Sequence, residues 1–315
     1  MSNLKLINMR DVEVEPICWL WYPFIPYGKV TIIQGDPGEG KTTLVLQIIA
    51  RLTKGESIID EDASQPINVI YQTAEDGLAD TIKPRLLAAN ADCSKVLVID
   101  DSDTPLTMRD ARLEQAIIET NAKLVVLDPI QGFLGADVDM HRANEIRPIM
   151  KHISELAEKY KCAIILIGHM NKCSTGKSAY RGLGSIDFQA AARSVLIVGR
   201  IKDEPEIRVV CQTKSSLAPE AKAVAFCLSE ENCFEWVGEY DVSADDLLSG
   251  TAKGTKKQAA MDFLESLLSG GQMSQTEIME LAERKSIAEK TLRNAKEALG
   301  IKSKRENNQW YWSLD

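Results

Sequence analysis

The feature that most constrains this chain is an eight-residue segment, Gly35-Asp-Pro-Gly-Glu-Gly-Lys-Thr42, which matches the pattern GxxxxGK[ST]. It follows the apolar segment KVTIIQ (29–34) and opens the helical sequence TTLVLQIIARL, the context that a phosphate-binding loop requires. Backbone N–H groups of such a loop surround a phosphate, and the helix N-terminus adds positive potential. The predicted loop residues are Gly35, Asp36, Pro37, Gly38, Glu39, Gly40, Lys41, Thr42 and Thr43.

Short apolar segments alternate with helical patterns along the first two thirds of the chain. Their β-branched residues and polar boundaries are typical of buried parallel strands. The predicted strands are 29–34, 67–72, 96–99, 124–127 and 163–167, with helices near 41–53, 78–90, 109–121 and 141–160. Strands without intervening helices follow at 194–198, 207–212, 223–227 and 233–237. The pattern predicts an α/β fold with a mainly parallel sheet, helices on both faces and an antiparallel extension.

A change of composition divides the chain into a large and a small domain. Residues 241–256 are acidic and then rich in Gly, Thr and Lys, which predicts a linker between domains 1–240 and 257–315, without an apolar contact tying them together. The small domain is expected to hold helices at 257–269, 275–284 and 287–299 and a hairpin from 301–304 and 309–314. Capping boxes at 274–277 and 286–289 and a C-terminal glycine, Gly300, support these helices. Three helices and a hairpin predict a winged helix.

Composition excludes several classes of protein. With 44% hydrophobic and 26% charged residues, the chain is not largely disordered, and no stretch approaches the ~20 apolar residues of a membrane span. The seven cysteines form no CxxC pair, and the N-terminus has no signal-peptide core, so we expect a cytoplasmic protein. The net charge is −9, but residues 251–315 carry 11 Lys and Arg against 9 Asp and Glu. Nucleic acid could therefore be bound only by local basic segments of the large domain or by the small one.

The residues around the loop predict ATP and Mg²⁺ as cofactors. Lys41 would reach the β- and γ-phosphates, and the hydroxyl of Thr42 would ligate Mg²⁺. A second Mg²⁺ group should end a hydrophobic strand, and KLVVLD places Asp128 there, where it would act through a water molecule.

Hydrolysis also needs a carboxylate that activates water. Pro129 follows Asp128, so the neighbouring strand end in INVIYQTAED is the other available place. Glu75 is the predicted general base, with Asp76 as the alternative or as a helix N-cap. His169 ends the AIILIG strand, where it could hydrogen-bond the γ-phosphate or simply cap and pack.

Together these motifs resemble the RepA-type branch of RecA-like hexameric ATPases, related to replicative helicases of plasmids and phages. The resemblance covers residues 17–240 and includes PYGK (26–29), GDPGEGKT, AED, LVVLDP, GHMNK, Arg181-Gly182, AAR193SVL and KSSLAP (214–219). It implies a RecA-like P-loop NTPase core and a hexameric ring. It also implies that Glu75 is the base, that His169 senses the γ-phosphate, and that Arg193 is an arginine finger toward the neighbouring subunit. A surface salt bridge is the alternative for Arg193, and Arg181 and Lys214 are further candidates.

Two regions could contact DNA. In such rings the loops after the fourth and fifth strands face the channel, here 132–144, which is acidic at Asp137 and Asp139, and 172–184, which is basic. The second is expected to bind single-stranded DNA through Lys177, Tyr180 and Arg181, unless it is purely structural. A recognition helix and wing could bind duplex DNA through Lys290, Arg293, Lys296, Lys302, Lys304 and Arg305. A solvated surface or a protein–protein module is the alternative, and Trp310 and Trp312 are expected to pack in the core rather than to stack on bases.

Two functions fit these predictions. The first is a ring-forming, helicase-like ATPase that acts in replication of a phage, plasmid or other mobile element. The second is an ATP-switched DNA-binding regulator, loader or recombination mediator that unwinds nothing. A metabolic kinase is less well supported, because it would leave His169 and Arg193 without a role.

Overall fold

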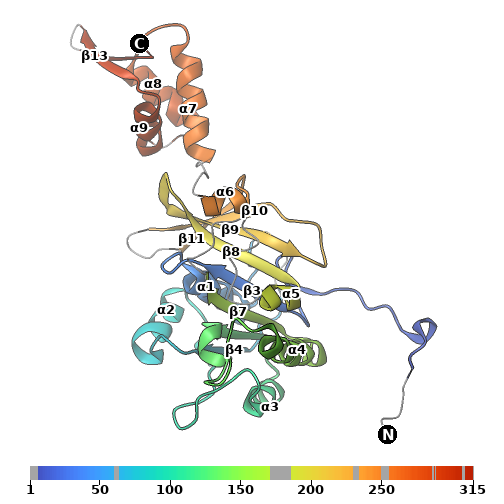
Figure 1. Cartoon of the computed structure of the whole chain (residues 1–315). Coiled ribbons are helices and arrows are strands. Elements are labelled where there is room, and N and C mark those ends of the chain that lie inside the picture. Colours follow the sequence, from blue (N-terminus) through green and yellow to red (C-terminus); the bar gives the residue numbers. More distant parts are fainter. Residues whose placement is uncertain are drawn as a thin grey trace. The chain divides into compact units, whose positions relative to one another are not determined.

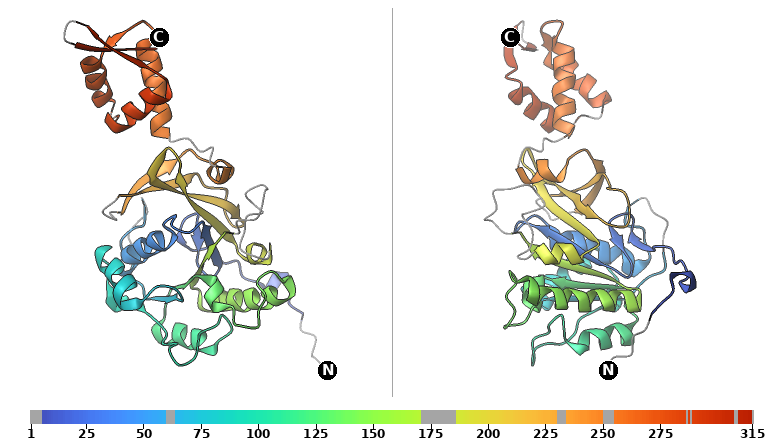
Figure 2. Two further views of the ribbon diagram at one scale, coloured as in Figure 1. Left: turned by 60° about the vertical axis from the view of Figure 1, so that its left-hand side comes forward. Right: turned by 45° about the vertical axis from the view of Figure 1, so that its right-hand side comes forward.

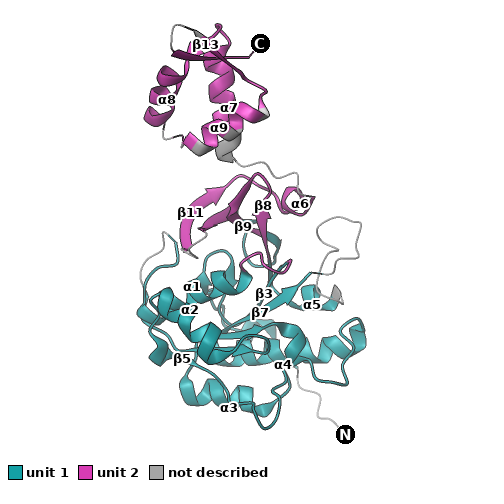
Figure 3. Cartoon of the chain, turned by 90° about the vertical axis from the view of Figure 1, so that its left-hand side faces the viewer, with its two compact units in different colours: residues 1–35, 41–196, 212–221 teal, residues 36–40, 197–211, 222–315 magenta. Residues whose placement is uncertain are grey.

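The computed structural model describes residues 6–59, 64–170, 186–229, 234–249, 255–285, 287, 289–306 and 309–314. Two compact units divide the chain: residues 1–35, 41–196 and 212–221 form unit 1, and residues 36–40, 197–211 and 222–315 form unit 2 (Figure 3). The predicted small domain is thus only one part of the second unit. No helix in the described ranges is long and apolar enough to cross a membrane.

The predicted α/β fold class is confirmed. Within the described residues the largest sheet has nine strands in the order β11-β10-β9-β8-β3-β7-β6-β4-β5. The pairs β3–β7, β7–β6, β6–β4 and β4–β5 are all parallel. These strands are β3 (Val30–Gly35), β4 (Val69–Thr73), β5 (Val96–Leu97), β6 (Leu124–Asp128) and β7 (Ala163–His169) (Figure 1). A short hairpin of β1 (Trp19–Trp21) and β2 (Ile25–Pro26), which the apolar pattern did not predict, precedes them.

Helices cover this parallel sheet because its strands alternate side chains between two buried faces. The α-helices of this part are α1 (Lys41–Lys54), α2 (Lys83–Ala88), α3 (Ala111–Thr120), α4 (Ala143–Tyr160) and α5 (Ile186–Ala191). Short turns of helix lie at Met9–Asp11, Leu78–Ile82, Cys93–Lys95 and Ile130–Phe133. One core cluster joins α3 and α4 to alternate residues of the strands, among them Ile32, Val125 and Ile164, and α1 lies on the other face (Figure 2).

The remaining strands of the large sheet form the extension. They are β8 (Ser194–Ile201), β9 (Glu204–Ser215), β10 (Ala223–Leu228) and β11 (Phe234–Tyr240), and β10 is antiparallel to both β9 and β11. β8 and β9 are longer than predicted, because their ends carry polar residues that an apolar pattern does not reveal. Cys233, expected to start the last of them, lies outside the described residues.

The expectation of a plain linker at 241–256 is wrong in part. Helix α6 (Ala244–Ser249) lies within it, and Leu247 is buried. The missing side chain of Gly199 on β8 makes room for Leu247, since a Cβ at Gly199 would lie 3.0 Å from its Cγ. Leu247 therefore packs α6 against β8 of the extension.

The C-terminal part of unit 2 contains the three predicted helices and the hairpin, together with a short strand, β12 (Met273–Ser274), that was not predicted. The helices and the hairpin strands are α7 (Thr255–Leu268), α8 (Gln275–Arg284), α9 (Glu289–Ala298), β13 (Lys302–Glu306) and β14 (Gln309–Ser313). Ser274 caps α8, where its Oγ accepts a hydrogen bond of 3.2 Å from the N–H of Glu277. Gly300 follows α9 with a φ of +66°, as a C-terminal glycine should. Leu264, Ile278, Leu292 and Trp312 are members of a separate core cluster, so this part buries its own apolar surface.

Candidate nucleotide site

The phosphate loop lies where the motif placed it, between the buried strand β3 and helix α1. Gly38 and Gly40 adopt φ values of +80° and +87°, which favour glycine and turn the loop back on itself. Lys41 is only 5% exposed, and its Nζ donates a hydrogen bond of 2.9 Å to the carbonyl of Gly35. The ammonium group is therefore held at the mouth of the loop, the place from which a P-loop lysine reaches phosphate.

Asp128 ends β6 next to this loop. Its Oδ2 accepts two hydrogen bonds, one of 2.7 Å from Oγ1 of Thr42 and one of 2.8 Å from the hydroxyl of Tyr71. Burial raises the pKa of Asp128, because a charge in an apolar surrounding loses its hydration, and the two hydrogen bonds oppose that rise. The structure thus brings together Thr42 and Asp128, the two residues predicted for Mg²⁺.

These groups fit a hydrated Mg²⁺ ion and a triphosphate. Mg²⁺ prefers oxygen ligands and usually keeps several waters, with one or two carboxylates near it. A hydroxyl and a carboxylate in hydrogen-bond contact supply such oxygens, and a buried carboxylate is stabilised by a nearby cation. Among the described residues no group of three or more His, Cys, Asp or Glu side chains could hold a metal by itself.

The parallel strand order places the predicted general base and the predicted γ-phosphate sensor at the same edge of the sheet as the phosphate loop. Gly35 is aligned with His169, and Thr73 with Asp128. Nε2 of His169 lies 3.7 Å from Oε2 of Glu75, whose side chain is 64% exposed. Glu75 is therefore open to water and close to a group that can orient it, as a general base requires.

Asp76 is not the helix N-cap that the sequence allowed. Gly77 takes that position without a side-chain cap, and the following segment, Leu78–Ile82, begins as a π-helix. Oδ2 of Asp76 instead lies 3.2 Å from Nη1 of Arg85. This ion pair across the irregular turn occupies the carboxylate, which makes Asp76 a weaker alternative to Glu75.

Arg193 stands directly before β8 and is exposed. Its backbone continues the sheet, because its N–H donates to the carbonyl of Val30 and its own carbonyl accepts from the N–H of Ser216, both at 3.0 Å. Within the described ranges its guanidinium forms no ion pair, so the salt-bridge alternative has no support there. Lys214, a further candidate, has a different place: its Nζ donates to the carbonyls of Gln189 and Ala190 at the end of α5.

Residues of unit 2 contact the loop residues 36–40, and sequence reasoning missed these contacts. Nη2 of Arg200 on β8 lies 3.4 Å from the carbonyl of Gly38, and its Nε lies 3.8 Å from Oε1 of Glu39. A Cβ at Gly40 would lie 2.8 Å from Cδ1 of Leu228 on β10. An Arg on a strand far along the chain carries no local signal of such a contact.

The predicted DNA-contacting residues are placed unevenly. Lys177, Tyr180 and Arg181 lie outside the described residues, as does the side chain of Lys290. Lys304 and Arg305 are exposed on β13. Arg293 forms an ion pair of 2.5 Å with Glu289, and Lys296 donates to Oγ of Ser303 and lies 4.5 Å above the ring of Trp312.

The expectation that both C-terminal tryptophans pack in the core is wrong for one of them. Trp312 is 2% exposed, whereas Trp310 is 47% exposed. The two residues are two positions apart on β14, so their side chains lie on the same face of the strand. Trp310 is at the end of the strand that is paired with Arg305, and the helices do not cover it there. Trp310 is thus an exposed aromatic ring beside a basic strand.

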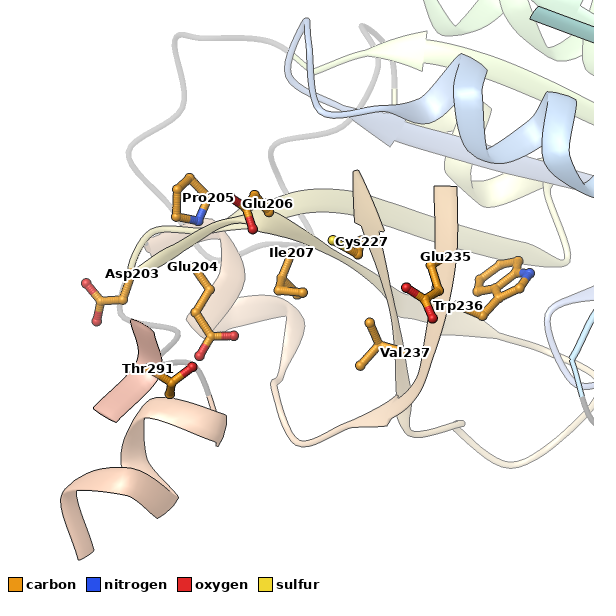
Figure 4. A pocket seen from close by; sticks show the side chains of 10 residues that line it. All are labelled: Asp203, Glu204, Pro205, Glu206, Ile207, Cys227, Glu235, Trp236, Val237 and Thr291. Carbon is orange, nitrogen blue, oxygen red and sulfur yellow. The ribbon is translucent and has the colours of Figure 1, made fainter. Parts of the chain in front are cut away.

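The antiparallel extension contains a pocket that is acidic, in contrast to the basic strand β13. Its lining includes four acidic residues on or beside β9 and β11: Asp203, Glu204, Glu206 and Glu235 (Figure 4). A phosphate backbone would be repelled by such a surface. This agrees with the negative charge that the sequence assigns to the part of the chain before residue 251.

A glycine-rich loop between strand and helix, a buried lysine and a paired hydroxyl and carboxylate define a P-loop nucleotide-binding protein. The chain belongs to the AAA domain family, whose model matches residues 3–175.

Several named proteins are similar to this chain. DNA repair protein RadA of Chlamydia pneumoniae is 26% identical over 176 residues, which cover 55% of this chain and 35% of RadA. Protein RecA of Bordetella pertussis is 23% identical over 215 residues, 64% of this chain and 58% of RecA. The chain thus spans about a third of the RadA protein's length. The KaiC-like protein PH0186 of Pyrococcus horikoshii superposes with a TM-score of 0.49 and 17% identity, covering 68% of this chain and 93% of that one.

Proposed function

We propose that this protein binds ATP with Mg²⁺, hydrolyses it as an assembly of several copies, and acts on DNA. The observation that carries the proposal is the convergence of Lys41, Thr42 and Asp128 at one edge of the parallel sheet. Similarity to RecA and to a protein named for DNA repair supports DNA as the partner.

Each side chain of the site has a separate role in hydrolysis. Bound ATP would supply the γ-phosphoryl group that is transferred to water, with ADP as the leaving group, and Mg²⁺ would neutralise the negative charge that develops on the phosphates. Lys41 would place a positive charge beside the phosphates, and Thr42 and Asp128 would hold the hydrated metal. Glu75 takes a proton from the attacking water on its carboxylate, and Nε2 of His169, 3.7 Å away, keeps that carboxylate in place. His169 would also register the γ-phosphate, and Arg193 would reach a neighbouring copy's nucleotide.

Two finer functions remain as proposals. One is the helicase of a RepA-type hexameric ring in replication of a mobile element, with single-stranded DNA in its channel on Lys177, Tyr180 and Arg181. The other is a recombination mediator or loader without unwinding. Similarity to a DNA repair protein, at 26% identity, favours the second, although the aligned part is 35% of that protein.

The ATPase rate with and without single-stranded DNA tests the proposal, together with the mass of the assembly in solution. We expect Mg²⁺-dependent hydrolysis that DNA stimulates and a mass of several chains. A forked substrate then separates the two finer functions, because only a helicase displaces the annealed strand. Absence of nucleotide turnover under all conditions would contradict the proposal.

We further propose that the C-terminal part is a winged helix that binds duplex DNA. Its separate core, its hairpin and the exposed Lys304 and Arg305 support this. Removal of residues 251–315 should leave ATP hydrolysis intact but weaken duplex binding. The slope of log affinity against log salt concentration should then fall by about one for each phosphate that the truncated protein no longer binds. Unchanged duplex binding after truncation would instead indicate a module that docks a protein partner.

A further inference from the structure

The hydroxyl of Tyr71 is buried beside the site, where Asp128 is its hydrogen-bond partner among the described residues. Tyr71 lies on β4, is 0% exposed, and donates its hydrogen bond of 2.8 Å to Oδ2 of Asp128. Its strand neighbours Val69 and Ile70 are buried too, and a phenylalanine at position 71 would keep the aromatic ring and lack only the hydroxyl. The hydroxyl therefore acts on the carboxylate rather than on the core.

The two hydrogen bonds of Asp128 fall on the same oxygen. Thr42 and Tyr71 both donate to Oδ2, and Oδ1 accepts none within the described residues. Two donors on one oxygen fix the rotation of the carboxylate about its Cβ–Cγ bond.

We propose that Tyr71 is a positioning residue for the metal: it holds Oδ2 of Asp128 so that Oδ1 is presented to the water shell of Mg²⁺. The inference rests on the proposed function, because it assumes that Asp128 serves a nucleotide-bound cation. Loss of a residue that orients a metal-binding group typically weakens metal binding by about 10–100-fold.

The chain offers a matched control. The hydroxyl of Tyr160 also donates to a carboxylate, Oε1 of Glu114, at 2.7 Å, but at the C-terminal end of α4 and with Lys159 as a second partner of that oxygen. Tyr160→Phe therefore removes a similar hydrogen bond without affecting Asp128. It reports what the loss of a tyrosine hydroxyl does by itself.

The test uses the full chain and measures binding of Mn²⁺ in the presence of ADP by electron paramagnetic resonance. Binding of a fluorescent ADP analogue in EDTA is measured in parallel. We expect Tyr71→Phe to weaken Mn²⁺ binding by about 10–100-fold and to leave metal-free ADP binding within about twofold, whereas Tyr160→Phe should match the wild type in both. In the background of Asp128→Asn, Tyr71→Phe should have no further effect on Mn²⁺.

The outcomes separate the inference from the proposed function. If the wild type binds Mn²⁺ with ADP and Tyr71→Phe binds it equally well, the assignment of Tyr71 is wrong and the nucleotide site stands. A lower melting temperature without weaker metal binding would show a packing role and also overturn the assignment. If the wild type itself binds no Mn²⁺ with ADP, both the proposed function and the inference are wrong.

Discussion

The phosphate loop and the basic residues of α9 and β13 were both predicted from short sequence patterns. The contacts that their side chains make are nevertheless different. Around the loop, residues from three strands and a helix converge: Thr42 and Tyr71 donate to Asp128, and Glu75 lies near His169. In the C-terminal part, two of the basic residues contact nearby side chains of the same small domain. Arg293 pairs with Glu289 one turn away, and Lys296 lies over Trp312.

The contrast between the two regions shows which kind of sequence pattern predicts a site. The carboxyl ends of parallel strands must meet at one edge of a sheet, so polar residues placed there are brought together by topology. Charges at helical spacing need only share a face, and each can pair with an acid on the next turn. Spacing along a helix therefore indicates a possible surface, whereas strand ends indicate a site.

The largest expected effect is that of Lys41→Ala, which tests whether the converging groups are the catalytic ones. It removes the charge that stabilises the transferred phosphoryl group, so steady-state hydrolysis should fall to background, by at least about 10²–10³-fold. Lys161→Ala is the control, since Lys161 pairs with Glu15 elsewhere in unit 1. Hydrolysis at the wild-type rate in Lys41→Ala would place the site elsewhere.

Arg193→Ala tests whether one essential residue acts outside this cluster, across a subunit interface. Nucleotide binding should be nearly normal and turnover slower by about 10³–10⁵-fold, the contribution of an arginine finger. Mixing this variant with Glu75→Gln should restore some hydrolysis at interfaces that hold both intact groups. A mixture that remains inactive while subunits exchange would show that Arg193 does not act in trans.

Glu75→Gln tests the assignment of the base. An amide cannot take the proton of the attacking water, so hydrolysis should fall by about 10²–10⁴-fold while binding of ATP, measured by equilibrium fluorescence, persists. Asp76→Asn is the matched variant and should retain most of the rate, because Asp76 is engaged with Arg85. The reverse result would move the base to Asp76.

The smallest effects concern the C-terminal surface and compare two of its lysines. Lys304→Ala should weaken duplex binding a few-fold and reduce the salt slope by about one. Lys296→Ala should leave the slope unchanged but lower the melting temperature, because a cation over an aromatic ring contributes about 0.5–1 kcal/mol at exposed sites. Burial lowers the pKa of Lys296, which agrees with a structural role. An equal reduction of the salt slope in both variants would show that both lysines bind DNA.

Sequence alone was enough for the α/β class and the phosphate loop, and it named Thr42 and Asp128 as the candidates for Mg²⁺. These depend on local patterns: apolar runs of strand length, a loop that only glycines can form, and an acid at a strand end. Helix α8 was also predicted at its observed bounds, since its cap and apolar face are both local. Errors arose where a local pattern was weak, as at Leu247 in an acidic segment and at Trp310 beyond the core.

The contacts that distant residues make with the site could be identified only from the tertiary structure. Tyr71 looks like one more apolar strand residue until β4 lies beside β6 and its hydroxyl meets Asp128. Arg200 is 162 residues from Gly38, whose carbonyl it contacts, and Asp76 is no cap because the turn after it is a π-helix and its carboxylate pairs with Arg85. A sequence pattern states the chemistry of each residue and its local conformation. The pairing of residues from different strands depends on the order of those strands in the sheet, which no single segment encodes.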